Sequence, residues 1–176
     1  MPDDAQESLF RTWLAEHGAA VLKVARAYTV TAEDRQDVVQ EILLQVWRSL
    51  PRYQGRASAS TWAYRVALNT ALVWRRQAHR RQARQRTVPV VEDLPAPGLD
   101  GPQRAAQAEI IERLYAAIRR LPKTDAALVM LHLDDLSHRQ IAEVLGITEN
   151  NVGVKLNRAK KALSALMKET SDEPRL

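Results

Sequence analysis

A stretch rich in proline, glycine and acidic residues interrupts the chain at residues 87–102, TVPVVEDLPAPGLDGP. Its four prolines and two glycines cannot sustain a helix, so the stretch is typical of a flexible acidic linker. Each flanking part must then bury its own apolar residues, and 176 residues are enough for two small domains. We therefore predict a first domain over residues 1–86, a linker over 87–105 and a second domain over 106–170.

Apolar residues recur at helical spacing in both parts, which predicts an all-α fold. A broad apolar stripe runs from Leu9 to Tyr28 in the first helix. Thr31 is placed to cap a second helix, which should end before Pro51. The core stripe expected in this second helix is Val39, Leu43, Val46 and Leu50. A third helix should follow and continue through the basic run to Arg86.

The second part ends in a helix, a tight turn and a longer helix, with the sequence SHRQIAEVLGITENNVGVKLNRAKKALSAL at residues 137–166. Ser137 and Gln140 have the spacing of a capping box, and Gly146 can adopt the left-handed conformation that ends the first helix. Thr148 should cap the longer helix, which carries amide and basic side chains opposite an apolar face. This pattern is typical of the DNA-binding helix-turn-helix, and an ordinary helical hairpin in a bundle is the alternative.

The charge distribution favours a nucleic acid as the partner. The formal net charge is +5, and no acidic residue occurs between Glu41 and Glu92, where ten arginines do. A basic segment of this length suits a phosphate backbone. Binding to a membrane surface would require the arginines to border one apolar helix face, and they do not. No apolar run is long enough to span a bilayer, so membrane insertion is not expected.

Aromatic residues accompany this basic segment. Residues 51–60 have the composition of a loop, and Tyr53, Trp62 and Tyr64 lie in or beside it. Aromatic rings next to arginines suit single-stranded bases, because the bases stack on the rings while the cations hold the phosphates. Packing in the small core of the first domain is the alternative, and composition does not decide between the two.

The residues that enzymes and metal sites need are missing or scattered. The sequence has no cysteine, and its four histidines lack metal-ligand spacing. It has no glycine-rich phosphate loop, no GxSxG elbow and no HExxH motif. We therefore predict no catalytic residues, no metal and no cofactor. The acidic N-terminal residues do not resemble a signal peptide, so a cytoplasmic protein is expected.

Three stretches together resemble the bacterial RNA polymerase sigma factors of the extracytoplasmic-function (ECF) group, which keep only regions two and four. Residues 37–41, DVVQE, are similar to the family's D-x-x-Q-E stretch. Residues 53–55 and 60–69, the latter STWAYRVALN, resemble the segment that captures and melts the minus-ten promoter element. Leu121-Pro122 and the helix-turn-helix resemble region four, which reads the minus-thirty-five element.

The resemblance implies a transcription initiation factor that binds core RNA polymerase and promoter DNA, with an anti-sigma factor as a further partner. The residues that it places against polymerase are Asp37, Gln40, Glu41 and Leu44. The residues that it places at the minus-ten DNA are Tyr53, Arg56, Trp62, Arg65, Asn69, Arg75 and Arg76. In the recognition helix and its surroundings, we expect bases to be read by Asn151, Val154, Lys155 and Arg158, and phosphates to be held by Asn150, Lys160 and Arg139.

Helical spacing underlies the choice of base-reading residues. Asn151 and Lys155 are one turn apart and Arg158 follows three residues later, so we expect them on the face opposite the apolar residues Val152, Leu156 and Ala159. Gly153 brings no side chain where the family often has a basic one, which would let DNA approach the backbone more closely.

Two other classes of protein remain as alternatives. A conventional helix-turn-helix regulator would dimerise through the first domain and bind duplex DNA by itself. An RNA-binding adaptor would use the arginine run and not the helix-turn-helix. A sigma factor, by contrast, should need polymerase.

Overall fold

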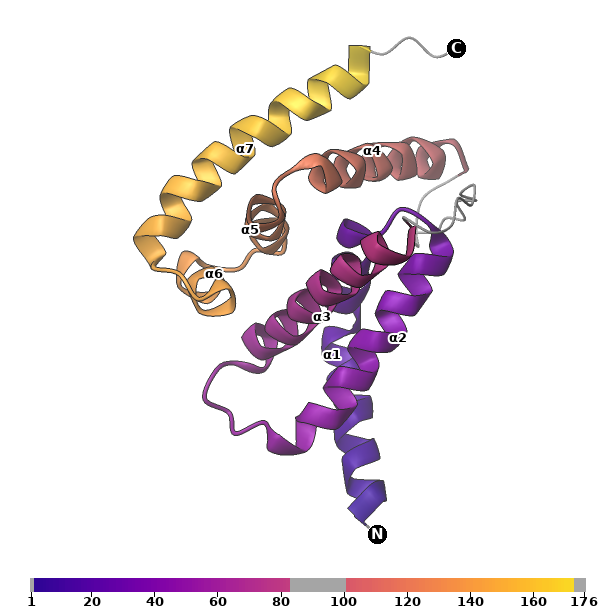
Figure 1. Ribbon diagram of the computed structural model, residues 1–176, viewed down its shortest axis with the longest axis vertical. Helices are drawn as coiled ribbons and strands as arrows, with labels where there is room; N and C mark the ends of the chain where they lie inside the picture. Colours follow the sequence, from indigo (N-terminus) through magenta and orange to yellow (C-terminus); the bar gives the residue numbers. More distant parts are fainter. Residues whose placement is uncertain (1, 83–100, 173–176) are drawn as a thin grey trace. The chain divides into compact units, whose positions relative to one another are not determined.

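The computed structural model describes residues 2–82 and 101–172, and all regular elements within these ranges are helices. The helices shown in Figure 1, together with one short 3-10 helix (η1), are α1 (Pro2–Tyr28), α2 (Ala32–Ser49), η1 (Leu50–Arg52), α3 (Ala59–Gln82), α4 (Gly101–Arg120), α5 (Lys123–Leu133), α6 (His138–Leu145) and α7 (Glu149–Asp172). The predicted all-α class is confirmed.

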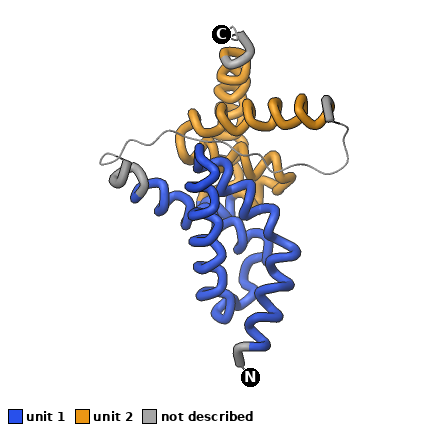
Figure 2. The backbone as a smooth tube through the Cα atoms, turned by 90° about the vertical axis from the view of Figure 1, so that its right-hand side faces the viewer, with its two compact units in different colours: residues 1–90, 142–146 blue, residues 91–141, 147–176 orange. Residues whose placement is uncertain are grey.

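The chain divides into two compact units (Figure 2). One consists of residues 1–90 with 142–146, and the other of residues 91–141 with 147–176. Residues 87–100 of the predicted linker lie outside the described residues. Residues 101–105 are helical and not extended, because α4 begins at Gly101. Pro102 is compatible with this start, since the first turn of a helix does not use the N–H that proline lacks.

Helices α1, α2 and α3 pack against one another and form the core of the first unit. Thr31 caps α2 as predicted, since its side-chain oxygen accepts a hydrogen bond from the Asp34 amide at 3.0 Å. From α1 the core receives Trp13, Val21, Val24, Ala25 and Tyr28. Leu9 lies on the predicted apolar stripe of α1 but is 50% exposed.

The predicted core stripe of α2 is confirmed at Val46 and Leu50 but is displaced by one residue before them. Val38, Ile42 and Val46 are fully buried, whereas Val39 and Leu43 are half-buried. Val38 is followed directly by Val39, and Ile42 by Leu43, and each residue turns a helix by about 100°. The spacing therefore identified an apolar side of α2 but not the row of residues at its centre.

Five aromatic rings form a continuous cluster that reaches from α2 to the loop before α3. Trp47 meets Phe10 edge-on with ring centroids 5.3 Å apart, and Phe10 stacks on Trp13 at 6.4 Å. Trp13 meets Trp62 edge-on at 6.1 Å, and Trp62 lies 5.0 Å from Tyr53. The cluster thereby joins the loop residue Tyr53 to the core of the first unit.

In the second unit, α5 packs against both α4 and α7. Every residue from Asp125 to Leu131 is buried, so α5 is the central helix of this unit. It ends at Leu133, and two residues later Asp135 has a φ of 58°, while the Leu136 amide donates to the Leu131 carbonyl at 3.2 Å. This left-handed residue closes the last turn of α5 and directs the chain into α6.

Candidate partner and nucleic-acid interfaces

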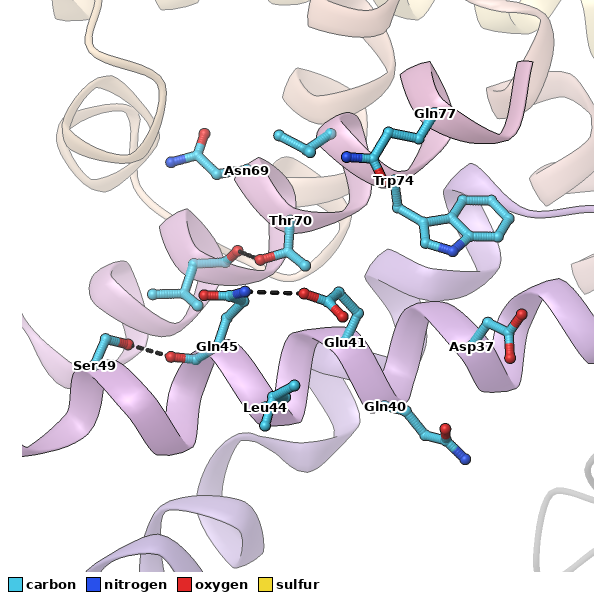
Figure 3. Close-up of a pocket in the computed structure, with 12 residues that line it drawn as sticks. Asp37, Gln40, Glu41, Leu44, Gln45, Ser49, Asn69, Thr70, Trp74 and Gln77 are labelled. Atoms are coloured by element: carbon cyan, nitrogen blue, oxygen red, sulfur yellow. Dashed lines mark hydrogen bonds between the residues drawn. The ribbon is translucent and has the colours of Figure 1, made fainter. Parts of the chain in front are cut away.

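A groove of about 800 Å³ between α2 and α3 contains all four residues predicted to bind polymerase (Figure 3). Its α2 side is formed by Asp37, Gln40, Glu41, Leu44, Gln45 and Ser49. Its α3 side is formed by Val66, Asn69, Thr70, Val73, Trp74 and Gln77. The groove lies entirely within the first unit.

This groove combines exposed apolar side chains with carboxylates. Leu44 is 40% exposed and Val73 is 43% exposed, although both belong to packed helices. Glu41 is oriented by Gln45, whose Nε2 donates to Glu41 Oε1 at 2.9 Å, and Asp37 is exposed. Apolar side chains bordered by polar ones are typical of a site for another protein.

Asn69 lies in this groove, although the sequence grouped it with the minus-ten residues. It follows Trp62 by seven residues, which is about 10 Å along a helix. Neither Tyr53 nor Trp62 lines the groove. The structure therefore brings Asn69 together with Glu41 and Leu44, and it separates Asn69 from the aromatic loop.

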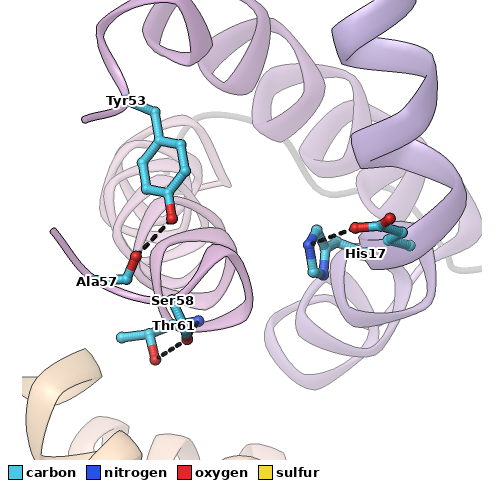
Figure 4. A network of polar contacts seen from close by, with 6 residues as sticks. His17, Tyr53, Ala57, Ser58 and Thr61 are labelled. Atoms are coloured by element: carbon cyan, nitrogen blue, oxygen red, sulfur yellow. Dashed lines mark hydrogen bonds and ion pairs between the residues drawn. The ribbon is translucent and has the colours of Figure 1, made fainter. Parts of the chain in front are cut away.

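The loop that leads into α3 is closed by its own hydrogen bonds (Figure 4). The Tyr53 hydroxyl donates to the Ala57 carbonyl at 2.5 Å. Ser58 caps α3, since its Oγ accepts from the Thr61 amide at 3.1 Å and donates to Thr61 Oγ1 at 2.8 Å. Tyr53 and Trp62 are both half-buried, so each ring packs on the core and still presents part of its surface to solvent.

The predicted minus-ten arginines differ in their surroundings. Arg56, Arg65 and Arg76 are exposed, whereas Arg75 is half-buried. Burial raises the pKa of the Tyr28 hydroxyl to about 12, and the positive charge of Arg75 acts in the opposite direction. Arg75 therefore lies close enough to the core to act on Tyr28. Arg56 and Arg76 present their charges to solvent, whereas Arg65 Nη2 donates to the Glu143 carbonyl.

The predicted helix, turn and helix are present in α6, the turn at Gly146 and α7. The Ser137 amide donates to Gln140 Oε1 at 2.9 Å, and the Gln140 amide donates to Ser137 Oγ at 3.3 Å, which completes the capping box. Gly146 has a φ of 67°. Thr148 caps α7, since its Oγ1 accepts from the Asn151 amide at 3.3 Å.

The exposed face of α7 differs from the expected one. Val152, Leu156 and Ala159 are buried and define the inward face. At about 100° per residue, the side directly opposite consists of Asn150, Val154, Asn157 and Lys161. Val154 is 67% exposed, in keeping with this position.

The expected base-reading residues do not all lie on this outermost face. Asn151 and Arg158 are exposed on one side of it, and Lys155 on the same side is half-buried. The short spacing from Asn151 to Arg158 predicts only this side of the helix. The three-turn spacing from Asn150 to Lys161 identifies the outermost row.

A hollow on the second unit, about 810 Å³ in volume, lies over this outermost face. Its lining residues are His138, Glu149, Asn150, Gly153, Val154, Asn157, Arg158 and Lys161. It brings together three predicted residues, Asn150, Val154 and Arg158, and leaves out the other four, Arg139, Asn151, Lys155 and Lys160. An adjoining hollow of about 440 Å³ includes Lys160.

Arg158 is held by a carboxylate of α5. Its Nη2 donates to Asp125 Oδ1 at 3.3 Å and to Oδ2 at 3.4 Å. Nearby, the pKa of His132 is lowered by burial and by the positive charges of Lys160 and His138. The end of α5 therefore lies close to the cations of the α6–α7 segment.

Within residues 2–82 and 101–172, no three histidine or carboxylate side chains gather where a metal ion could bind. None of the described helices has the combined length and apolar character that crossing a bilayer requires.

Comparison with known families assigns both parts of the chain. The sequence profile of Sigma-70 region 2 matches residues 13–81, and that of Sigma-70, region 4 matches residues 111–163. The ECF RNA polymerase sigma factor SigM of Mycobacterium tuberculosis is 28% identical over 164 residues, which cover 93% of this chain and 77% of SigM. The RNA polymerase sigma-H factor of Pseudomonas aeruginosa is 31% identical over 155 residues, which cover 78% and 77%.

Two solved structures have a similar fold. CnrH in complex with the cytosolic domain of CnrY has a TM-score of 0.66 at 23% identity, covering 93% of this chain and 89% of CnrH. The sigma factor RpoE of Bartonella quintana, in complex with the anti-sigma factor NepR, has a TM-score of 0.68 at 17% identity, covering 90% and 96%. With regions 2 and 4 in this order and relatives matched over most of their length, the chain belongs to the ECF group of RNA polymerase sigma factors.

Proposed function

We infer that this sigma factor directs core RNA polymerase to specific promoters and initiates transcription there by binding and melting promoter DNA. The observation that carries this inference is the presence of regions 2 and 4 in one chain. We further propose that the protein acts in the cytoplasm and catalyses no reaction itself.

The polymerase interface in this proposal is the α2–α3 groove. Asp37, Gln40, Glu41 and Leu44 all line it, and its apolar side chains Leu44 and Val73 are exposed although they belong to packed helices. The carboxylates suit a partner surface that carries basic side chains. Asn69 lies in the same groove, so we extend the proposed interface to this residue.

The minus-ten interface in this proposal is the loop at Tyr53 with the start of α3. Unstacking a base costs a few kcal/mol, which ring stacking and cation contacts must repay. Tyr53 and Trp62 offer partly exposed rings held by the core, and Arg56 and Arg65 are exposed nearby in the sequence. We assign phosphate contacts to Arg65 and Arg76 and base stacking to the rings.

The minus-thirty-five interface in this proposal is the exposed side of α7. Asparagine can pair with adenine and lysine can donate to guanine in the major groove, each worth about 1–3 kcal/mol of discrimination. Asn151, Lys155 and Val154 are the proposed base-reading residues. Asn150, Lys160 and Arg139 are the proposed phosphate-binding residues, and all three are exposed.

An anti-sigma factor is the proposed regulatory partner. Two structurally similar sigma factors were solved in complex with CnrY and with the anti-sigma factor NepR. A protein that covers the α2–α3 groove of this chain would compete with polymerase for the same side chains.

Transcription in vitro tests the proposed function. The full chain is added to bacterial core RNA polymerase on a library of duplexes with randomised upstream sequences, and the transcripts are sequenced. We expect transcripts that depend on the chain and share two upstream elements. Sequence-specific binding to duplex DNA without polymerase, together with no such transcripts, would instead identify a conventional regulator.

A further inference from the structure

Two adjoining hollows meet at Gly153 in the second unit. Both are lined by His138, Gly153, Asn157 and Lys161. Gly153 forms the part of α7 that has no side chain, and His138 at the start of α6 stands across from it. The two hollows therefore form one depression beside α7, which we call the Gly153 hollow.

Packing within the chain does not require glycine at this position. A Cβ atom built on Gly153 would meet only the His138 ring, at 3.8 Å from Cε1, which is ordinary van der Waals contact. Glycine inside a helix costs about 0.5–1 kcal/mol relative to alanine. The fold would therefore be more stable with alanine, and the empty space must be explained in another way.

The Gly153 hollow is lined by more cationic than anionic groups. Lys160, Lys161 and His138 border it, and neither lysine makes an ion pair within the described residues. Asp125 partly neutralises Arg158, so the two lysines are the uncompensated positive charges of the hollow. Glu149 is the one carboxylate in the lining of either hollow.

The neutral groups of the lining are also suited to an anion. Asn157 is exposed and can donate from its side-chain amide, and Ser164 can donate from its hydroxyl. An apolar ligand would not need this combination of ammonium, amide and hydroxyl donors. A phosphodiester oxygen accepts from all three.

We propose that the Gly153 hollow binds one backbone phosphate of promoter DNA, with Lys161 and Asn157 as donors. Gly153 keeps the floor of the hollow open, so that the phosphate can come close to α7 and to His138. The proposal rests on the proposed function and adds Gly153, Asn157, Lys161 and His138 to the residues that contact DNA.

The substitution Gly153→Ala tests the proposal by separating stability from binding. It should raise the unfolding temperature by about 2–4 °C, because helix propensity improves and the methyl group fits. It should nevertheless weaken promoter binding by holoenzyme about five- to tenfold, equally on every minus-thirty-five sequence. The matched control is Gly18→Ala in α1, where a Cβ atom would meet Leu14 Cδ1 at 3.4 Å. This control should gain stability and leave promoter binding unchanged.

A second pair of variants tests the charge. Lys161→Gln should make the negative slope of log affinity against log salt concentration less steep by about 0.9, the value for one phosphate contact. Lys168→Gln lies two turns further along α7 and should leave the slope unchanged. All variants are assayed as full chains bound to core polymerase, on labelled promoter duplexes selected with the wild-type protein.

Three outcomes would overturn the phosphate assignment. The first is unchanged promoter affinity for both Gly153→Ala and Lys161→Gln. The second is a changed preference at one minus-thirty-five position in Gly153→Ala, which would place a base in the hollow. The third is an equal loss of salt dependence in Lys161→Gln and Lys168→Gln, which would indicate a general charge effect. If the wild-type chain directs no promoter-specific transcription, the proposed function has failed and not this inference alone.

Discussion

Arg158 and Asp125, 33 residues apart in the sequence, form a two-point contact that joins α7 to α5. Arg158 Nη2 lies 3.3 Å from one carboxylate oxygen of Asp125 and 3.4 Å from the other. The Asp125 side chain is 7% exposed, whereas that of Arg158 is 69% exposed. The contact therefore joins the recognition helix to a carboxylate that is almost completely shielded from solvent.

Removing this contact should destabilise the second unit. Arg158→Ala leaves the buried carboxylate without its cation, so we expect a loss of about 1–2 kcal/mol in the free energy of unfolding, measured by urea denaturation. Asp125→Asn should cost a similar amount, and the double variant should cost less than the sum of the two. Asn157→Ala is the control on the exposed side of α7. Strict additivity of the two single variants would contradict the coupling.

The groove on α2 and α3 predicts a charge-sensitive polymerase interface. Asp37→Lys should abolish or strongly reduce co-purification with core RNA polymerase, because it places a like charge opposite the proposed basic partner surface. Glu16→Lys makes the same change of charge on an exposed position of α1 outside the groove and should retain binding. Circular dichroism checks that both variants are folded. Equal binding by the two variants would refute the assignment.

The separation of Tyr53 from Asn69 predicts two different defects in open-complex formation. Tyr53→Ala should impair melting of duplex promoters, and a template already mismatched at the minus-ten region should restore much of the activity, because unpairing is then not required. Asn69→Ala should show little such rescue, since Asn69 lines the groove that we propose as the polymerase interface.

Tyr53→Phe is the matched control for the ring. It keeps the stacking surface and removes only the hydrogen bond to the Ala57 carbonyl. Melting should therefore stay close to wild type. If the mismatched template rescues Asn69→Ala as much as Tyr53→Ala, Asn69 acts at the minus-ten element.

Two lysines of α7 should differ in their effect on promoter selection. Lys155→Ala should relax the preference at one position of the minus-thirty-five element, whereas Lys160→Ala should weaken all sequences alike and flatten the salt dependence. Selection from randomised elements measures the first effect, and titration at several salt concentrations measures the second. An unchanged selected sequence in Lys155→Ala would show that the base-reading residues lie elsewhere on α7.

His132 should report the arrival of DNA at the second unit. In the free protein its pKa is lowered by burial and by the charges of Lys160 and His138, so the folded state disfavours protonation. This effect should lower stability as the pH falls below about 6.5, the ordinary histidine pKa. A bound phosphate would offset the two cations, and the pKa of His132 should then rise. Titration by NMR with and without promoter DNA tests this, and Lys160→Ala should raise the pKa in the absence of DNA.

Features that depend on neighbouring residues were predictable from the sequence. The caps at Thr31, Ser137 and Thr148 and the left-handed Gly146 all appear as expected. Each depends on hydrogen bonds or backbone angles within four residues, which short motifs encode. The helical class and the helix-turn-helix follow from the same local rules.

Features that depend on packing between helices were not predictable. The central buried row of α2 is set by how α2 packs against α1 and α3, and spacing alone left a rotation of one residue open. The place of Asn69 in the groove depends on how α3 lies against α2. The contact of Arg158 with Asp125 was not predictable, because nothing near Arg158 in the sequence points to a carboxylate in another helix.

Helix α3 has two roles along its length, since it begins at the aromatic loop and forms one wall of the groove a few turns later. A protein bound in the groove would reduce the mobility of α3, and with it that of the loop anchored by Trp62. DNA binding would then cost less conformational entropy, because the loop is already ordered when the DNA arrives. Partner binding at the groove would in this way preorganise the loop for DNA. Thermodynamic reciprocity then requires the converse: DNA bound at the loop would raise the affinity of the groove for its protein partner by the same factor.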